Sequence, residues 1–124
     1  MTREFILNTL LPYKEDRNNC GFEVKTGQCF YKSSDGKRCA VGKHLTEGEH
    51  LEYGGSVIDL FVNYDKNIIL TKEALDQNIP DNVWNCMQDY HDSIASNRKS
   101  IAVINSIVEV LENTTKFKFP ELYF

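Results

Sequence analysis

The chain lacks any apolar run close to the roughly 20 residues that a transmembrane helix needs, so we expect no membrane-spanning segment. It also lacks an excess of basic residues, because 14 Lys and Arg stand against 18 Asp and Glu, and the net charge is −4. The two signs are interspersed, which excludes a broad basic face for duplex nucleic acid. The first residues, 1–4, include an acidic side chain and do not have a signal-peptide profile, so we expect a cytoplasmic protein.

Recognisable catalytic motifs are missing from the sequence as well. It contains no Gly-x-Ser-x-Gly nucleophile motif, and no cysteine has a recognisable histidine partner. Gly36-Lys37 lacks the upstream glycine and the following helix of a Walker phosphate-binding loop. We therefore expect a binding protein that is not an enzyme and that needs no cofactor.

The cysteines do not form the Cys-x-x-Cys pairs that zinc sites use. They are spaced 9, 10 and 47 residues apart, at Cys20, Cys29, Cys39 and Cys86. We interpret them as buried, reduced thiols of a cytoplasmic protein, with no metal site. The alternative is a metal site in which ligands converge from adjacent hairpin arms, namely Cys29, Cys39, His44 and His50.

A β-hairpin is the clearest local pattern in the first half of the chain. Two short apolar runs flank Asp35-Gly36, a strong hairpin signal because glycine adopts positive φ without steric cost. A second turn is expected at Thr26-Gly27. At the end of the second arm lies Gly42, whose missing side chain lets another segment or a ligand approach the backbone.

Helical patterns occur at both ends of the chain. Thr2 is a suitable N-cap for a first helix, which we expect to end at Pro12. Ser56 and Thr71 are expected to cap short helical segments. Towards the C-terminus, apolar residues recur at helical spacing on both sides of a break at 96–98, which predicts two long helices.

Together these patterns predict an α+β fold in one domain, residues 1–124. A small antiparallel β-sheet or hairpin core would occupy a sheet-rich part at 20–44. It would be accompanied by an N-terminal helix and by two long C-terminal helices, the helical part at 80–114, that mediate oligomerisation.

The oligomer is inferred from the segment 101–111, whose apolar stripe is wider than a helix on the surface of a monomer needs. The sheet of the same chain or a partner subunit would cover it, and we favour the partner subunit. The tail at 116–124 is also apolar, so we expect it to dock on its own body or on a neighbour.

A second face of the first C-terminal helix carries the candidate binding residues. Trp84, Gln88 and His91 follow one another at spacings of four and three, with Asp92 beside them. Rings such as Trp84 can stack on a base, and polar groups can read its edges. The alternatives are that Trp84 belongs to the core and that His91-Asp92 is a surface pair.

Three cations complete the candidate site. Arg98 and Lys99 lie at the corner between the two helices, where they could meet a phosphate, and Arg38 lies in the hairpin. The His91-Asp92 doublet also occurs in metal-dependent phosphohydrolases, but those enzymes need further His and Asp ligands on neighbouring helices. The other histidines lie in a loop region, which argues against that enzyme class.

The hairpin pattern Cys29-Phe-Tyr…Asp35-Gly-Lys-Arg-Cys-Ala-Val-Gly42, followed by Met87-Gln-Asp-Tyr-His-Asp92, resembles a group of small phage and prophage proteins. Within this group the chain resembles the first class of Thoeris anti-defence proteins. Those proteins sequester cyclic ADP-ribose signals made by bacterial TIR-domain enzymes and do not degrade them.

The resemblance implies a symmetric homo-oligomer in the host bacterial cytoplasm, with nucleotide pockets at a subunit interface. Some members of the family also hold cyclic oligonucleotides elsewhere. Our own assignment gives adenine stacking to Trp84 or a nearby tyrosine, and base or ribose edges to Gln88 and Asp92. The pyrophosphate would contact Arg38, Arg98 and Lys99. The alternative function is a phage protein–protein inhibitor or adaptor of a host factor.

Overall fold

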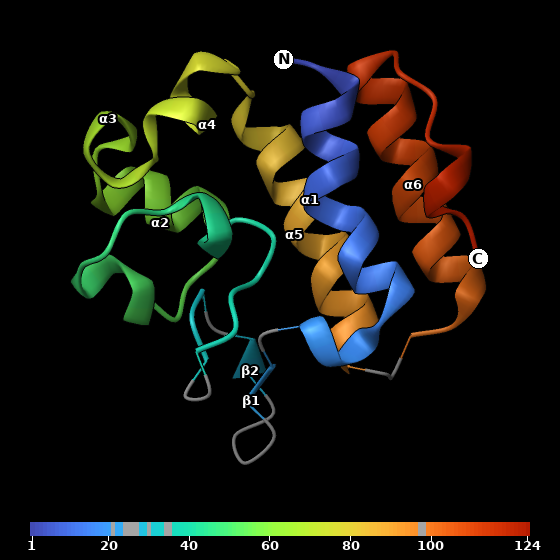
Figure 1. The fold of residues 1–124 in the computed structure, drawn as a ribbon, viewed down its shortest axis with the longest axis horizontal. Coiled ribbons are helices and arrows are strands. Elements are labelled where there is room, and N and C mark those ends of the chain that lie inside the picture. Colours follow the sequence, from blue (N-terminus) through green and yellow to red (C-terminus); the bar gives the residue numbers. More distant parts are fainter. Residues whose placement is uncertain (21, 24–27, 30, 34–35, 97–98) are drawn as a thin grey trace.

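The computed structural model describes residues 1–20, 22–23, 28–29, 31–33, 36–96 and 99–124. The three longest helices, at residues 3–15, 81–96 and 101–115, lie side by side, and the short helical segments of residues 42–76 lie to one side of them (Figure 1). The α-helices are α1 (Arg3–Glu15), α2 (Val57–Asn63), α3 (Lys66–Ile69), α4 (Lys72–Asp76), α5 (Asp81–Ser96) and α6 (Ile101–Thr115). The strands are β1 (Phe22–Glu23) and β2 (Gln28–Cys29). The 3₁₀ turns are η1 (Arg17–Asn19), η2 (Gly42–His44), η3 (Glu49–Glu52) and η4 (Pro120–Leu122).

Helix α5 is the centre of the fold, because α1, α2 and α6 all pack against it. Val83, Met87 and Tyr90, on its predicted apolar face, are fully buried. Trp84 and His91, on the second face, are buried as well, at 1% and 0% exposure. A helix with neighbours on three sides has little surface left for solvent.

The predicted α+β fold with a sheet core at 20–44 is wrong, because the fold is helical. Strands β1 and β2 pair antiparallel over two residues each, and Lys32 and Arg38 form an isolated bridge across the predicted hairpin. The backbone N–H of Val41 donates to Gln88 Oε1 on α5 at 3.1 Å and not to a neighbouring strand. The expected second arm is therefore held in part by a helix, while its Cys39 N–H still donates to Tyr31 O of the first arm at 3.4 Å.

Local capping signals place most helix starts where the sequence predicts them. The side chains of Thr2, Ser56 and Thr71 accept hydrogen bonds from the first turns of α1, α2 and α4. The expected stop at Pro12 is wrong, since α1 continues to Glu15. The Pro12 carbonyl oxygen accepts a hydrogen bond from the backbone N–H of Asp16, the C-cap residue. Proline lacks a donor and its ring crowds the carbonyl four residues earlier, but Pro12 lies in the last turns of α1, and the backbone bonds that follow it continue the helix to Glu15.

Helix α6 buries one side and exposes the other. Ile104, Val108 and Leu111 face the core, whereas Ile101, Val103 and Val110 are 58%, 42% and 55% exposed. The wide apolar stripe predicted from the sequence is thus present and is only partly covered by the chain itself. Within the described ranges, no helix combines the length and the apolar character that crossing a membrane requires.

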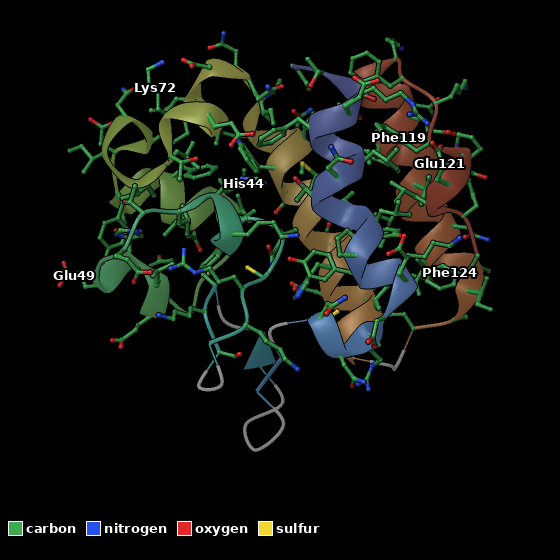
Figure 2. The ribbon with its side chains drawn as sticks, in the orientation of Figure 1. His44, Glu49, Lys72, Phe119, Glu121 and Phe124 are labelled. Carbon is green, nitrogen blue, oxygen red and sulfur yellow. The ribbon has the colours of Figure 1, made fainter. Side chains whose placement is uncertain are left out.

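The C-terminal tail docks on its own body, which settles the two alternatives that the sequence left open. Figure 2 shows Phe119 and Glu121 beside α6, and the Phe119 side chain is fully buried. Glu112 of α6 accepts hydrogen bonds from the Phe119 N–H at 2.6 Å and from the Tyr123 hydroxyl at 2.7 Å. Arg3 of α1 forms an ion pair with Glu121, so the two ends of the chain are joined.

Candidate ligand-binding site

Trp84 lies in the core and not at the surface. Its ring packs edge-on to Phe5, with centroids 6.3 Å apart, and contacts His44 at 5.7 Å. Because the side chain is 1% exposed, its faces are covered by protein in this structure. The placement agrees with the core role that the sequence left open for Trp84.

Gln88, His91 and Asp92 form one hydrogen-bonded network on α5. Asp92 Oδ1 accepts from Gln88 Nε2 and lies 2.8 Å from His91 Nδ1. Gln88 uses its carbonyl oxygen to hold the backbone of Val41, so the network connects α5 to the segment before η2. Of the surface pair that the sequence allowed, His91 is fully buried, whereas the Asp92 side chain is 39% exposed.

The Asp92 carboxylate determines the tautomer of His91. A carboxylate only accepts, so the neutral imidazole carries its proton on Nδ1 and leaves Nε2 as an acceptor. His91 is fully buried, and its ring lies edge-on to Tyr13 at 4.7 Å. Within the described part of the chain, nothing donates to His91 Nε2.

A small pocket of about 130 Å³ opens between α5 and the loop before α2. Gln88 and Asp92 are both in its wall, so the structure brings two of the predicted site residues to one cavity. The other lining residues are Tyr31, Gly55, Ser56, Val57, Asn85 and Asp89. The Tyr31 hydroxyl donates to Gly55 O at 3.1 Å and fixes the loop against the pocket wall.

Asn85 and Asp89 are pocket residues that were not predicted from the sequence, although their spacing places them on the same helix face as Asp92. Asn85, Asp89 and Asp92 follow one another at intervals of four and three, which places them on one face of a helix. Partial burial and the nearby Asp92 carboxylate raise the pKa of Asp89. The pocket is consequently acidic and rich in hydrogen-bond acceptors.

A second cavity of about 290 Å³ runs as a groove between α5 and α6. Asn85 and Asp89 line this groove too, so it adjoins the pocket on the same side of α5. Its remaining walls are the polar Asn82 and Ser106, and the apolar Cys86, Val103, Ile107 and Val110. The two cavities together form a polar pocket with an apolar extension.

The predicted cations do not line either cavity in the described structure. Arg38 donates to the backbone oxygens of Gly42 and Leu45 and pairs with Glu47, so it holds the loop around η2. Lys99 is exposed just before α6. Arg98 lies outside the described residues.

The prediction of buried, free thiols is confirmed for Cys20, Cys39 and Cys86. Burial raises the pKa of Cys20 to about 11 and those of Cys39 and Cys86 to about 12, so the thiols are protonated near neutral pH. The side chain of Cys29 lies outside the described residues.

The alternative metal site finds no support among the described side chains, in which no three His, Cys, Asp or Glu residues are placed to hold a metal ion. His44 contacts the Thr9 hydroxyl at 2.8 Å, and His50 contacts Thr46 O at 2.6 Å. Both histidines are thus engaged in the packing of the loops.

Comparisons with models of protein families, with curated proteins and with solved structures find no match to this chain.

Proposed function

We propose that the chain is a phage anti-defence protein that binds and sequesters cyclic ADP-ribose isomers without degrading them, and so blocks Thoeris immunity. The observation that carries this proposal is the pocket beside α5, whose wall contains the predicted residues Gln88 and Asp92. The pattern of the hairpin and of residues 87–92 supports the same function through the family resemblance.

The pocket offers the groups that a nucleoside needs. Carboxylates accept hydrogen bonds from ribose hydroxyls, as acidic residues do in dinucleotide-binding folds, and here Asp89 and Asp92 supply them. Asn85 presents an amide that can both donate to and accept from a base edge. Tyr31 also lines the pocket, but its side chain is 4% exposed, so like Trp84 it has no free face for stacking on a base.

The size of the cavities indicates how the ligand lies. Pockets for small molecules usually measure about 300–1,000 Å³, and the pocket of about 130 Å³ holds only part of a dinucleotide. Because Asn85 and Asp89 border both the pocket and the adjoining groove, the ligand spans the two, with its adenosine in one and its second ribose in the other.

The negative charge of the ligand requires cations, which a second subunit can supply. A pyrophosphate next to Asp89 and Asp92 needs cations, and the described linings contain none. A homo-oligomer supplies them when an exposed cation such as Lys99 of another copy approaches the groove. It also encloses the ligand, as the submicromolar affinity of a sponge requires, about −8 to −12 kcal/mol.

The test is an uptake-and-release assay. The protein is incubated with cyclic ADP-ribose isomers, freed of unbound ligand and heated, and the released ligand is identified by chromatography and mass spectrometry. Intact ligand supports sequestration, and altered ligand indicates an enzyme. Absence of uptake overturns the proposal and favours the alternative, a protein–protein inhibitor or adaptor of a host factor.

A pair of variants tests whether the ligand is bound in the pocket. Asp89→Asn removes a carboxylate from the pocket wall, and we expect it to weaken binding by about tenfold or more, the equivalent of about 1.4 kcal/mol. Asp76→Asn is the matched control, since it makes the same change on α4, where the carboxylate pairs with Lys72. If calorimetry gives the two variants equal affinities for cyclic ADP-ribose, the ligand does not bind in this pocket.

A further inference from the structure

A further cavity, separate from the proposed ligand site, lies where α2, α3 and α4 meet the turn before α5. It measures about 430 Å³, which is larger than either cavity beside α5 and within the usual range of about 300–1,000 Å³ for a binding pocket. Leu70, Leu75 and Ile79 line it with apolar side chains, and Asp65 and Asn78 add polar groups. The three short helices lie together at the left of Figure 1, away from α6.

The apolar wall of this cavity continues onto the outside of α2. Phe61 lines the cavity, and Ile58 lies three residues before it and four residues before Val62, so the three side chains share one side of the helix. Val62 is 78% exposed, and Ile68, beside the lining residue Asn67, is 73% exposed. Among the described residues these are the two most exposed large apolar side chains. This side of the molecule therefore leaves apolar area in water next to a cavity.

The same region has an excess of negative charge. Residues 57–81 contain five carboxylates and only two lysines. Both lysines are already paired within the chain, Lys66 with Asp81 at 2.6 Å and Lys72 with Asp76 at 3.1 Å. The positive charges of the region are thus used, and the surplus is acidic.

The remaining carboxylates of the region have no cation. Asp59, Asp65 and Glu73 are exposed, and none of them takes part in an ion pair with another described residue. Asp65 also lines the cavity, where its carboxylate accepts a hydrogen bond from the Asn67 N–H at 2.9 Å. We call these three carboxylates, together with the exposed Ile58, Val62 and Ile68, the α2–α4 face. Its unpaired charges are all negative, and they surround one largely apolar cavity.

The charge of the α2–α4 face selects the chemistry of its partner. Nucleic-acid phosphates and the anionic headgroups of membranes would meet charges of the same sign, so neither is suited to this face. Lysine and arginine side chains of another protein would instead pair with carboxylates that have no cation in the free chain. An apolar side chain beside them would leave water by entering the cavity, as the anchor residues of protein interfaces do.

We propose that the α2–α4 face binds a basic segment of a partner protein. One apolar side chain of that segment occupies the cavity between Leu70, Leu75 and Ile79. Its lysines or arginines pair with the carboxylate of Asp65 at the cavity and with the other unpaired carboxylates of the face.

This inference does not depend on a bound nucleotide. None of the residues that line this cavity lines the pocket or the groove beside α5. A partner on the α2–α4 face and a ligand beside α5 therefore contact different side chains, and each can be tested without the other.

The experiment measures the binding of three short synthetic peptides of equal length to the full chain. The first is composed of leucine and lysine, the second has glutamate in place of lysine, and the third has serine in place of leucine. We expect the leucine–lysine peptide to bind at least about tenfold more tightly than either of the others. Its affinity should fall as salt is added, because salt screens exposed charge pairs. NMR spectra of the isotope-labelled chain locate the site, and the amide shifts should be largest in residues 57–81.

Two matched pairs of variants connect the binding to this face. Val62→Ser should weaken binding of the leucine–lysine peptide about threefold or more, whereas Val110→Ser, the same change at an exposed valine of α6, should leave it unchanged. Glu73→Gln should weaken it about twofold to fivefold and reduce its salt dependence. Glu109→Gln is the control for that change, since Glu109 is exposed on α6 and has no ion pair with another described residue.

Three results would overturn the inference: equal affinities for the lysine and glutamate peptides, amide shifts that are largest outside residues 57–81, or no binding of any peptide at roughly 1 mM. All the changed side chains are exposed, and circular dichroism verifies that each variant is folded. A chain that binds the peptide on this face but takes up no cyclic ADP-ribose refutes the proposed function alone. A chain that takes up the nucleotide but binds no peptide refutes this inference alone.

Discussion

Replacing Gly42 with alanine inserts a methyl group where two backbone segments touch. A Cβ at this position would lie 1.9 Å from the carbonyl oxygen of Tyr31 and 2.7 Å from its carbonyl carbon, whereas ordinary contacts begin at 3.4 Å. The obstacle is backbone, so no side-chain rotation relieves it. One of the two segments must move by more than 1 Å.

Neither segment is free to move. The Tyr31 side chain is 4% exposed and its hydroxyl bonds to Gly55 O. On the other side, the Gly42 carbonyl accepts from Arg38 and its N–H donates to Cys39 Sγ. Overpacking usually costs about 1–3 kcal/mol, and with both segments tied we expect the upper end, about 3 kcal/mol. That is a large part of a typical total stability of about 5–15 kcal/mol.

The assay is urea unfolding followed by the fluorescence of Trp84, the one tryptophan of the chain, which is buried. Gly54→Ala is the matched control, because its Cβ would meet nothing within 4 Å. We expect the free energy of unfolding of the control to stay the same or to rise by up to about 1 kcal/mol, because alanine makes the unfolded chain less flexible than glycine does. If Gly42→Ala unfolds at the same urea concentration as Gly54→Ala, the packing of Tyr31 on Gly42 described above is incorrect.

Two further expectations concern stability. Burial, with a smaller effect of Lys43, lowers the pKa of His44 to about 4 from an ordinary value near 6.5, so the folded state favours the neutral ring. Folding stability should therefore decline as the pH falls from about 6.5 to about 4, by up to about 3 kcal/mol, and a His44→Gln variant should lack this decline. Unfolding curves of both proteins across this range measure it, and parallel pH dependences would contradict it. Glu112→Ala removes the acceptor of the Phe119 N–H and the Tyr123 hydroxyl, so we expect a loss of about 1–3 kcal/mol and faster amide exchange in 116–124. Glu73→Ala on α4 is the control, and equal exchange in the tail of both variants would show that Glu112 does not hold it.

The sequence predicted the features that short-range chemistry controls. Side-chain caps act within one turn, so Thr2, Ser56 and Thr71 mark real helix starts. The two long C-terminal helices follow from apolar spacing alone, whereas Ser96 of the predicted break is still helical and residues 97–98 lie outside the described residues. Gly42 was identified as a place of close approach, and Tyr31 is the segment that approaches it.

Tertiary packing decided the rest, since a local pattern does not say which neighbour an apolar face will meet. The residues before η2 form a short apolar run that the sequence predicts as a hairpin arm, but Val41 finds its hydrogen-bond partner in Gln88 of α5. Trp84 and His91 form a plausible surface face in sequence, and they are buried because α5 is enclosed by α1, α2 and α6. Asn85 and Asp89 border a pocket only because the loop before α2 folds over them. Helix starts depend on contacts within a few residues, whereas cores and cavities depend on contacts between segments far apart in the chain.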